Sequence, residues 1–500
     1  MKEKLEKLKS ILAETQDLGF AGAVLSWDQE TYMPNGGAEA RGHILGTLGK
    51  IAHQKFTSDE VGKLLEDLES ETADLDPDSD DARLIKVTKR EFEKNTKVPG
   101  DMIVEKANLT TASNMAWREA RENNDFSLFA PHLEKLLDWN KRYVELFGPY
   151  DHIYDPLLDD YEPNMKTAEV KAIFDIVRPK QVEIIEAIAA KPEIDDSVLH
   201  QKYPIDAQTA MGNEIITAIG YDFNRGRMDT THHPFSTTFG YGDNRITVRY
   251  EEDFFNPFLF AAMHEAGHAM YEQGVSKDLE RTPLFGGTSL AIHESQSRLW
   301  ENMVGRSKPF WDWYYPKLQE RFPNQLENSD VNSFYKAINK VEPSYIRVEA
   351  DEATYNLHIM LRMELEIDMM EGKIDIKDLP DAWNSRFEEY LGIVPDNDAN
   401  GVLQDVHWSF GLYGYFSTYA LGNLVSAQLW NRMLKDHPNV EEEIRAGNFT
   451  SIFNWMSEKV YRHGAKFDPQ ELVKSITGSN IDGDAYIQYL HKKFGDIYEL

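Results

Sequence analysis

TTHHPFSTTFGYGDNRITVRYEEDFFNPFLFAAMHEAGHAMYEQG, residues 230–274, changes from a strand-like to a helix-like hydrophobic pattern. In its first part Ile246, Val248 and Tyr250 alternate with polar residues, and the cluster Gly-Tyr-Gly-Asp-Asn precedes them. Alternation after a glycine- and asparagine-rich cluster is typical of a β-hairpin. We therefore expect a short hairpin immediately before the helical part.

The second part of the stretch predicts a helix from about residue 257 to residue 273. Asn256 is a suitable N-cap, Pro257 suits the first helical turn, and Gly274 can end the helix. The segment HEAGH then lies in the middle of this helix, and its first and last residues project from one face.

Two histidines four residues apart on a helix can bind one metal ion. His264 and His268 have this spacing, and Glu265 beside the first can take a proton from water. The pattern indicates a zinc hydrolase, although two histidines also reach this spacing by chance in a chain with 15 of them.

A catalytic zinc site needs a third protein ligand, and the segment TSLAIHESQSRLWENMVG (288–305) offers one. Its spacing is helical, and Glu294 follows the histidine pair by 26 residues. A carboxylate is the usual partner of such a pair, but His293 competes for the role. Glu301 lies on the same helical face as Glu294, where it can orient a ligand histidine or simply face solvent.

The rest of the chain predicts helices and a soluble, intracellular protein. Apolar residues recur at intervals of three and four in residues 5–18, 61–75, 129–147 and 168–190. The net charge of −32 argues against nucleic acid and against an anionic membrane surface as partners. There is no cysteine, signal peptide or membrane-spanning run, which fits the cytoplasm.

Six motifs, in order along almost the whole chain, carry a resemblance to a known family. They are HPF (233–235), DNRIT (243–247), HEAGH (264–268), HESQ (293–296), IRVEAD (346–351) and GVLQDVHW (401–408). Taken with LSWDQETYMPNGG (25–37), the sequence resembles the Taq-type zinc metallocarboxypeptidases. These are similar in architecture to neurolysin and angiotensin-converting enzyme.

The resemblance implies a mainly helical, elongated body with a deep active-site groove and one small sheet beside the metal helix. It implies a single catalytic domain over residues 1–500, with two helical lobes flanking the groove. His264, His268 and Glu294 then bind zinc, with cobalt or manganese as substitutes. Glu265 is then the general base and the proton donor to the leaving amine. A homodimer is also implied.

A carboxypeptidase must hold the terminal carboxylate of its substrate, and arginine suits this through bidentate geometry. Arg347 of IRVEAD is the first candidate and Arg245 of DNRIT the second. For each, the alternative is a structural ion pair, with Asp351 and Asp243 nearby. The resemblance implies that the DNRIT region closes one end of the groove, which favours short peptides.

The oxyanion formed during peptide hydrolysis needs hydrogen-bond donors. His407 is one candidate, and a buried histidine bonded to Asp405 is its alternative. Tyr415 is favoured among the tyrosines that follow, while Tyr413 and Tyr419 remain open. His233 of HPF is expected to border the site without binding metal.

The sequence thus predicts a protease of the hydrolase class, a metallocarboxypeptidase that releases single C-terminal residues from short peptides with broad specificity. An endo-oligopeptidase or a dipeptidyl carboxypeptidase of the same fold is the alternative within zinc chemistry. A binding or chaperone-like protein with a vestigial metal site is the alternative outside it, and the presence of Glu265 argues against that.

Overall fold

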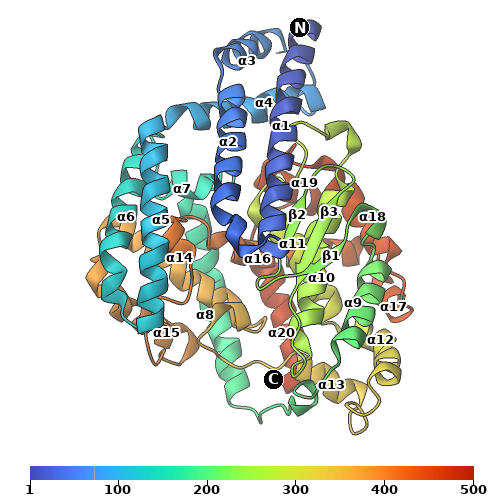
Figure 1. The fold of residues 1–500 in the computed structure, drawn as a ribbon. Helices are drawn as coiled ribbons and strands as arrows, with labels where there is room; N and C mark the ends of the chain where they lie inside the picture. Colours follow the sequence, from blue (N-terminus) through green and yellow to red (C-terminus); the bar gives the residue numbers. More distant parts are fainter. Residues whose placement is uncertain (73) are drawn as a thin grey trace.

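The structure, a computed structural model, describes residues 1–72 and 74–500 and is mainly helical (Figure 1). The helices before the sheet are α1 (Lys2–Thr31), α2 (Ala38–Phe56), α3 (Asp59–Glu71), α4 (Asp80–Lys97), α5 (Gly100–Asn123), α6 (Ala130–Glu145), α7 (Asp155–Asp159), α8 (Thr167–Ala189) and α9 (Ile205–Ile219). The helices after the sheet are α10 (Asn256–Gly274), α11 (Leu290–Arg298), α12 (Lys308–Arg321), α13 (Val331–Ile338), α14 (Tyr355–Glu371), α15 (Leu379–Leu391), α16 (Ser417–Asp436), α17 (Val440–Arg445), α18 (Thr450–Lys459), α19 (Pro469–Thr477) and α20 (Asp484–Tyr498). The predicted helical fold class is confirmed.

The small sheet contains the expected hairpin and one further strand. Strands β2 (Ser236–Thr238) and β3 (Asn244–Val248) pair antiparallel, with Ser236 opposite Ile246. Strand β1 (Met228–Thr230) pairs parallel to β3 on its other side, which gives the order β1-β3-β2. Strand β1 was not predicted, because three residues are too few to show a periodicity.

Helix α10 has the predicted extent but a different N-terminus. Its N-cap is Phe255, and no side chain caps it. The predicted cap Asn256 is instead the first helical residue, and its side-chain oxygen is buried without a hydrogen-bond partner in the described part of the chain. The prediction that Asn256 caps α10 is therefore wrong, whereas the helix itself and its end at Gly274 are confirmed.

The predicted helix over residues 288–305 is helical but not uniform. The α-helix α11 ends at Arg298, and a π-helix continues from Leu299 to Gly305. Because a π-helix has more residues in each turn, it changes the direction in which the following side chains point. π-Helical turns of this kind are frequent at functional sites.

Two clusters of buried apolar side chains hold these elements together. The larger contains residues of α10, α11, α14, α16 and most other helices from α6 onward. The smaller joins α1, α3 and α4 to the loop after α10, with Leu8, Leu68, Leu84 and Leu284 at its centre. The first helices are therefore packed against the segment that follows the metal helix, as the upper part of Figure 1 shows.

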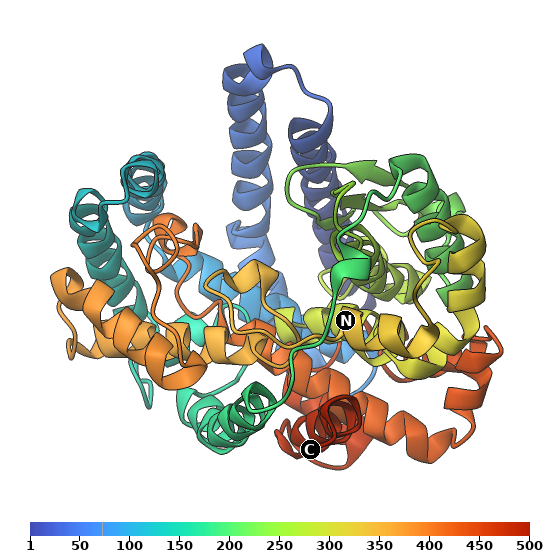
Figure 2. The ribbon, with the colours of Figure 1, turned by 90° about the horizontal axis from the view of Figure 1, so that it is seen from below.

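Helices α1 and α2 form a hairpin that extends away from the rest of the molecule when seen from below (Figure 2). No residue of α2 is buried. Within residues 1–72 and 74–500, no helix combines the length and the hydrophobicity that crossing a membrane requires. The single domain, the two lobes and the groove remain predictions.

Candidate active site

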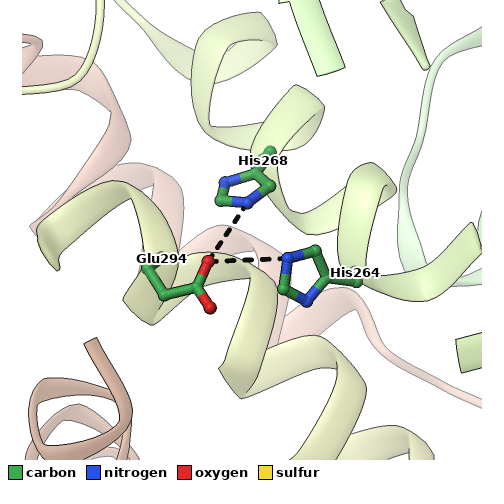
Figure 3. Close-up of side chains that lie close together, drawn as sticks. All are labelled: His264, His268 and Glu294. Carbon is green, nitrogen blue, oxygen red and sulfur yellow. Dashed lines mark ion pairs between the residues drawn. The ribbon is translucent and has the colours of Figure 1, made fainter. Parts of the chain in front are cut away.

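The three side chains predicted as metal ligands lie close together (Figure 3). The Nε2 atoms of His264 and His268 are 3.5 and 3.4 Å from the same carboxylate oxygen, Oε2 of Glu294. The histidines come from α10 and the glutamate from α11. Two neighbouring helices therefore direct two nitrogens and one oxygen to one point.

Two glycines allow the helices around this point to approach each other closely. A Cβ atom on Gly267, between the two histidines, would lie 2.7 Å from the carbonyl oxygen of Gln296 in α11. A Cβ atom on Gly422 in α16 would lie 2.6 Å from Cγ of Glu294. Since real Cβ atoms do not approach other atoms so closely, side chains at these positions would displace α11 and its ligand.

A carboxylate fixes the orientation of the first histidine. Oε2 of Glu301 lies 2.9 Å from Nδ1 of His264, on the opposite side of the ring from Glu294. Burial raises the pKa of Glu301, but the charges of Arg298 and His264 outweigh it and lower the pKa to about 2. An ionised carboxylate can only accept, so Nδ1 carries a hydrogen and Nε2 is the nitrogen that remains to bind a cation.

The second histidine is oriented through another histidine. Nδ1 of His268 lies 2.6 Å from Nδ1 of His293, whose Nε2 lies 2.8 Å from Oε1 of Glu272. When His293 donates to Glu272, its Nδ1 accepts from His268, whose Nε2 then presents a lone pair. His293 was open as a competing ligand, but its ring is joined to the far side of His268.

Arg298 holds the remaining oxygen of the carboxylate ligand. Its Nε donates to Oε1 of Glu294 at 2.7 Å, and its Nη1 donates to Glu301 at 3.0 Å. Neither Arg298 nor Glu272 was predicted from the sequence as part of the site. The available signal was spacing, because Arg298 stands four residues after Glu294 and Glu272 four residues after His268 on the same helices.

These donors fit a divalent metal ion. The distances of 3.4 and 3.5 Å from the ring nitrogens to Glu294 exceed those of ordinary hydrogen bonds. With both Nδ1 atoms engaged as donors, the two Nε2 atoms and a carboxylate oxygen are the groups that remain to bind a cation placed between them. Two histidines and one carboxylate are a common catalytic ligand set for zinc.

Glu265 follows His264 directly in the chain and therefore lies beside this point. Its side chain is 6% exposed and makes no hydrogen bond within the described residues. Burial raises the pKa of Glu265 to about 7, although the charge of His264 opposes the shift. A buried carboxylate with a pKa near neutrality can both accept and release a proton at physiological pH.

Arg347, the first predicted clamp residue, belongs to a buried cluster of two arginines and one aspartate. Nε and Nη2 of Arg347 donate to Oδ1 of Asp405 at 3.0 and 2.8 Å, and Nε of Arg362 donates to Oδ2 at 2.6 Å. The ion pair considered between Arg347 and Asp351 is therefore absent from the described structure. Asp351 instead accepts from the backbone N–H groups of Ala353 and Thr354.

The predicted oxyanion donors lie next to this cluster. Nε2 of His407 is 3.5 Å from the hydroxyl of Tyr419, and the ring of Tyr415 is 5.3 Å from that of His407. Burial lowers the pKa of His407 to about 4, so the ring is neutral at physiological pH. Nδ1 lies 3.8 Å from Asp405, too far for a hydrogen bond. Tyr413 is separate from them, 1% exposed in the core.

The second clamp candidate and His233 lie at the sheet. Arg245 donates to both carboxylate oxygens of Asp243 at 2.8 and 2.7 Å, which is the structural ion pair considered as the alternative to a clamp. Its guanidinium also lies 4.6 Å from the ring of Trp27 in α1 and 4.8 Å from that of Phe239. His233 is exposed and has no hydrogen-bond partner among the described residues.

Comparisons with known proteins agree with this geometry. The family described as carboxypeptidase Taq (M32) metallopeptidase matches residues 7–494. Carboxypeptidase 1 of Bacillus subtilis is 39% identical over 96% of either chain. Thermostable carboxypeptidase 1 of Thermus thermophilus is 39% identical over 99% of this chain and 98% of the relative. The crystal structure of the M32 carboxypeptidase from Deinococcus radiodurans covers 100% of both chains at 39% identity, with a TM-score of 0.97.

Proposed function

Because the chain belongs to the carboxypeptidase Taq (M32) metallopeptidase family and is a metallocarboxypeptidase, we propose that it depends on zinc and releases single C-terminal residues from short peptides. The observation that carries this proposal is the buried cluster of Arg347, Arg362 and Asp405, in which positive charge exceeds negative. A substrate carboxylate compensates that excess, whereas a peptide bond in the middle of a chain does not.

His264, His268 and Glu294 would hold the metal. Zinc fits the two imidazoles and one carboxylate best, while cobalt and manganese accept the same ligands. A divalent cation bound there supplies Lewis-acid chemistry, since it polarises the peptide carbonyl and makes water more acidic. Glu301 and the pair of His293 and Glu272 keep the two imidazoles in the tautomer that binds a cation.

Glu265 is the proposed general base. It takes a proton from the attacking water and returns it to the amine of the departing residue, so the same carboxyl serves both steps. Its burial and its lack of a hydrogen-bond partner support this role, because no group among the described residues competes for the proton.

Arg347 is the proposed clamp for the terminal carboxylate. A guanidinium has five N–H donors, and three of those of Arg347 are engaged by Asp405 and Tyr355. One hydrogen remains on each terminal nitrogen, which is the pair that a carboxylate accepts in bidentate geometry. The clamp fixes which peptide bond reaches the base.

His407, Tyr415 and Tyr419 are the proposed donors around the reacting carbonyl and the terminal residue. We assign His407 and Tyr415 to the oxyanion and Tyr419 to substrate binding. The neutral ring of His407 and the contacts among the three rings support this assignment. We place Arg245 and His233 at the border of the site, with Arg245 limiting peptide length.

A direct test uses N-terminally blocked dipeptides and longer peptides with the zinc-loaded protein. Release of single C-terminal residues, abolished by a chelator and by amidation of the peptide, supports the whole proposal. Cleavage inside amidated peptides supports an endo-oligopeptidase, and release of dipeptides supports a dipeptidyl carboxypeptidase. No observation in the structure favours either alternative.

Two further expectations rest on the resemblance and on composition alone. We propose that the enzyme is a homodimer and that it acts in the cytoplasm on short peptides of broad composition. Light scattering on the purified protein measures the first, and cell fractionation measures the second.

A further inference from the structure

Tyr355 contacts two arginines that belong to different parts of the site. Its hydroxyl accepts a hydrogen bond from Nη1 of Arg347 at 2.9 Å. The guanidinium carbon of Arg298 lies 4.5 Å from the centroid of its ring. The side chain is 6% exposed. One buried tyrosine therefore stands between the proposed carboxylate clamp and the arginine that holds Glu294.

The backbone keeps Tyr355 in a defined place. It is the first residue of α14, and its N–H donates to the carbonyl oxygen of Asp351 at 3.0 Å. The carboxylate of Asp351 accepts from the N–H groups of Ala353 and Thr354 at 2.9 and 3.1 Å. The start of α14 is thus fixed by a residue of the same IRVEAD motif that contains Arg347.

The hydroxyl and the ring of Tyr355 contact different groups. The hydroxyl binds one terminal nitrogen of Arg347, while Asp405 binds the other edge of the guanidinium. These two contacts together define the plane of the guanidinium and hence the direction of its free hydrogens. The ring instead stacks on Arg298, which donates to Glu294 at 2.7 Å.

We propose that Tyr355 is a positioning residue with two separable effects. Its hydroxyl directs Arg347 toward the terminal carboxylate of the substrate, and its ring holds Arg298 and thereby the metal ligand Glu294. The first effect rests on the proposed role of Arg347 as clamp, whereas the second is independent of it.

The variant Tyr355→Phe tests the hydroxyl, since it keeps the ring on Arg298. We expect KM for a blocked dipeptide with a free carboxylate to rise about tenfold, with kcat within about twofold and metal affinity equal to that of the parent. Tyr203→Phe is the matched control, because it too removes the hydroxyl of a buried tyrosine. The Tyr203 hydroxyl lies outside the site, where it donates to the carbonyl oxygen of Val198 at 2.5 Å. An unchanged KM in Tyr355→Phe overturns the first effect.

The variant Tyr355→Leu tests the ring. We expect its affinity for zinc, measured by competition with a chromophoric chelator on the apoprotein, to fall roughly tenfold or more below that of Tyr355→Phe. Equal affinities in the two variants overturn the second effect. Should Tyr355→Leu fail to fold, the kinetics of Tyr355→Phe still decide the first.

Arg347→Lys separates failure of this inference from failure of the proposed function. Lysine keeps the charge beside Asp405 but lacks the bidentate fork. If Arg347→Lys handles free-acid peptides as the parent does, the clamp itself is misassigned. If Arg347→Lys no longer hydrolyses free-acid peptides while Tyr355→Phe still does so as the parent does, Arg347 is the clamp and only the role of the Tyr355 hydroxyl is wrong.

Discussion

Glu301 and His264 form a hydrogen bond of 2.9 Å on the side of the imidazole ring that faces away from Glu294. This contact crosses from the π-helix after α11 back to α10. It places a hydrogen on Nδ1 of His264 and leaves Nε2 as the nitrogen that can bind a metal ion. The order of the groups, carboxylate, imidazole and then the proposed metal position, is typical of zinc sites, in which the carboxylate fixes the orientation of the ligand histidine.

Replacement of Glu301 is expected to weaken metal binding. In Glu301→Ala the imidazole of His264 loses its acceptor, and its tautomer and rotation become free. The affinity of the apoprotein for zinc should fall roughly 10- to 100-fold in a chelator competition. Glu320→Ala, an exposed glutamate of α12, is the matched control and should bind zinc as the parent does. Parental affinity in Glu301→Ala would contradict the orienting role.

His293 offers a different test, because a glutamine can replace its two hydrogen bonds. In His293→Gln the amide oxygen can accept from His268, and the amide nitrogen can donate to Glu272. His293→Leu can do neither. We expect the leucine variant to lose roughly tenfold or more in zinc affinity and the glutamine variant to keep most of it. A result in which both variants lose affinity equally argues for packing rather than hydrogen bonding.

Glu265→Gln should separate metal binding from catalysis. The amide fills the same space but cannot accept a proton from water, so turnover of a blocked dipeptide should fall roughly 10²- to 10⁴-fold. Zinc content, measured by atomic absorption after dialysis, should equal that of the parent, because Glu265 is not among the three converging ligands. Undiminished hydrolysis in this variant removes Glu265 from the mechanism.

Local sequence spacing was sufficient to predict the hairpin, helix α10 and the set of three converging side chains. His264 and His268 share a helical face at any location in a fold, and Glu294 follows on the next helix. The end of the α-helical pattern at Arg298 was not predictable, because apolar spacing does not distinguish an α-helix from a short π-helix.

Contacts between distant segments were not predictable from one sequence. Asp351 stands four residues after Arg347 in the chain, yet the partner of this arginine is Asp405, 58 residues away. Trp27 and Arg245 meet although 218 residues separate them (245 − 27). Such pairings depend on how the elements pack in three dimensions, and the sequence around either residue does not identify its partner.

A buried glutamate away from the proposed ligands makes stability depend on pH. Glu162 is 0% exposed, its Oε1 accepts from the backbone N–H of Ala291 at 2.6 Å, and the side chain of Ser289 also hydrogen-bonds its carboxylate. Burial raises its pKa from 4.5 to about 8. Between these values the folded protein keeps a proton that the unfolded chain has lost. The contribution of Glu162 to the free energy of unfolding is therefore fully present below about pH 4.5 and is lost as the pH rises through about 8.

Glu162→Gln should remove this dependence, because the amide does not titrate and its oxygen still accepts from Ala291. Relative to the parent, the variant should gain roughly 1 kcal/mol of stability for each pH unit between 5 and 8 in urea unfolding. Glu183→Gln, an exposed glutamate of α8, should show no such trend. A constant difference between Glu162→Gln and the parent across this range means that Glu162 does not titrate there.

Arg245 provides the test of how peptide length is limited. Its side chain contacts Asp243 in the turn between β2 and β3, Phe239 in the same turn, and Trp27 of α1. It nevertheless remains 21% exposed. We propose that Arg245 lies at the edge of the site, where a cation held so firmly can exclude a chain that extends past it. Arg245→Ala opens that edge without touching the three converging ligands.

In Arg245→Ala the ratio of turnover on a blocked pentapeptide to that on a blocked dipeptide should therefore rise by roughly fivefold or more, which corresponds to about 1 kcal/mol of lost discrimination. Zinc affinity should not change. Arg249→Ala is the matched control, since the exposed Arg249 follows β3 directly but pairs with Glu251 at 2.7 Å. If both variants keep the parental ratio, the limit on peptide length lies in another part of the site and Arg245 serves the sheet alone.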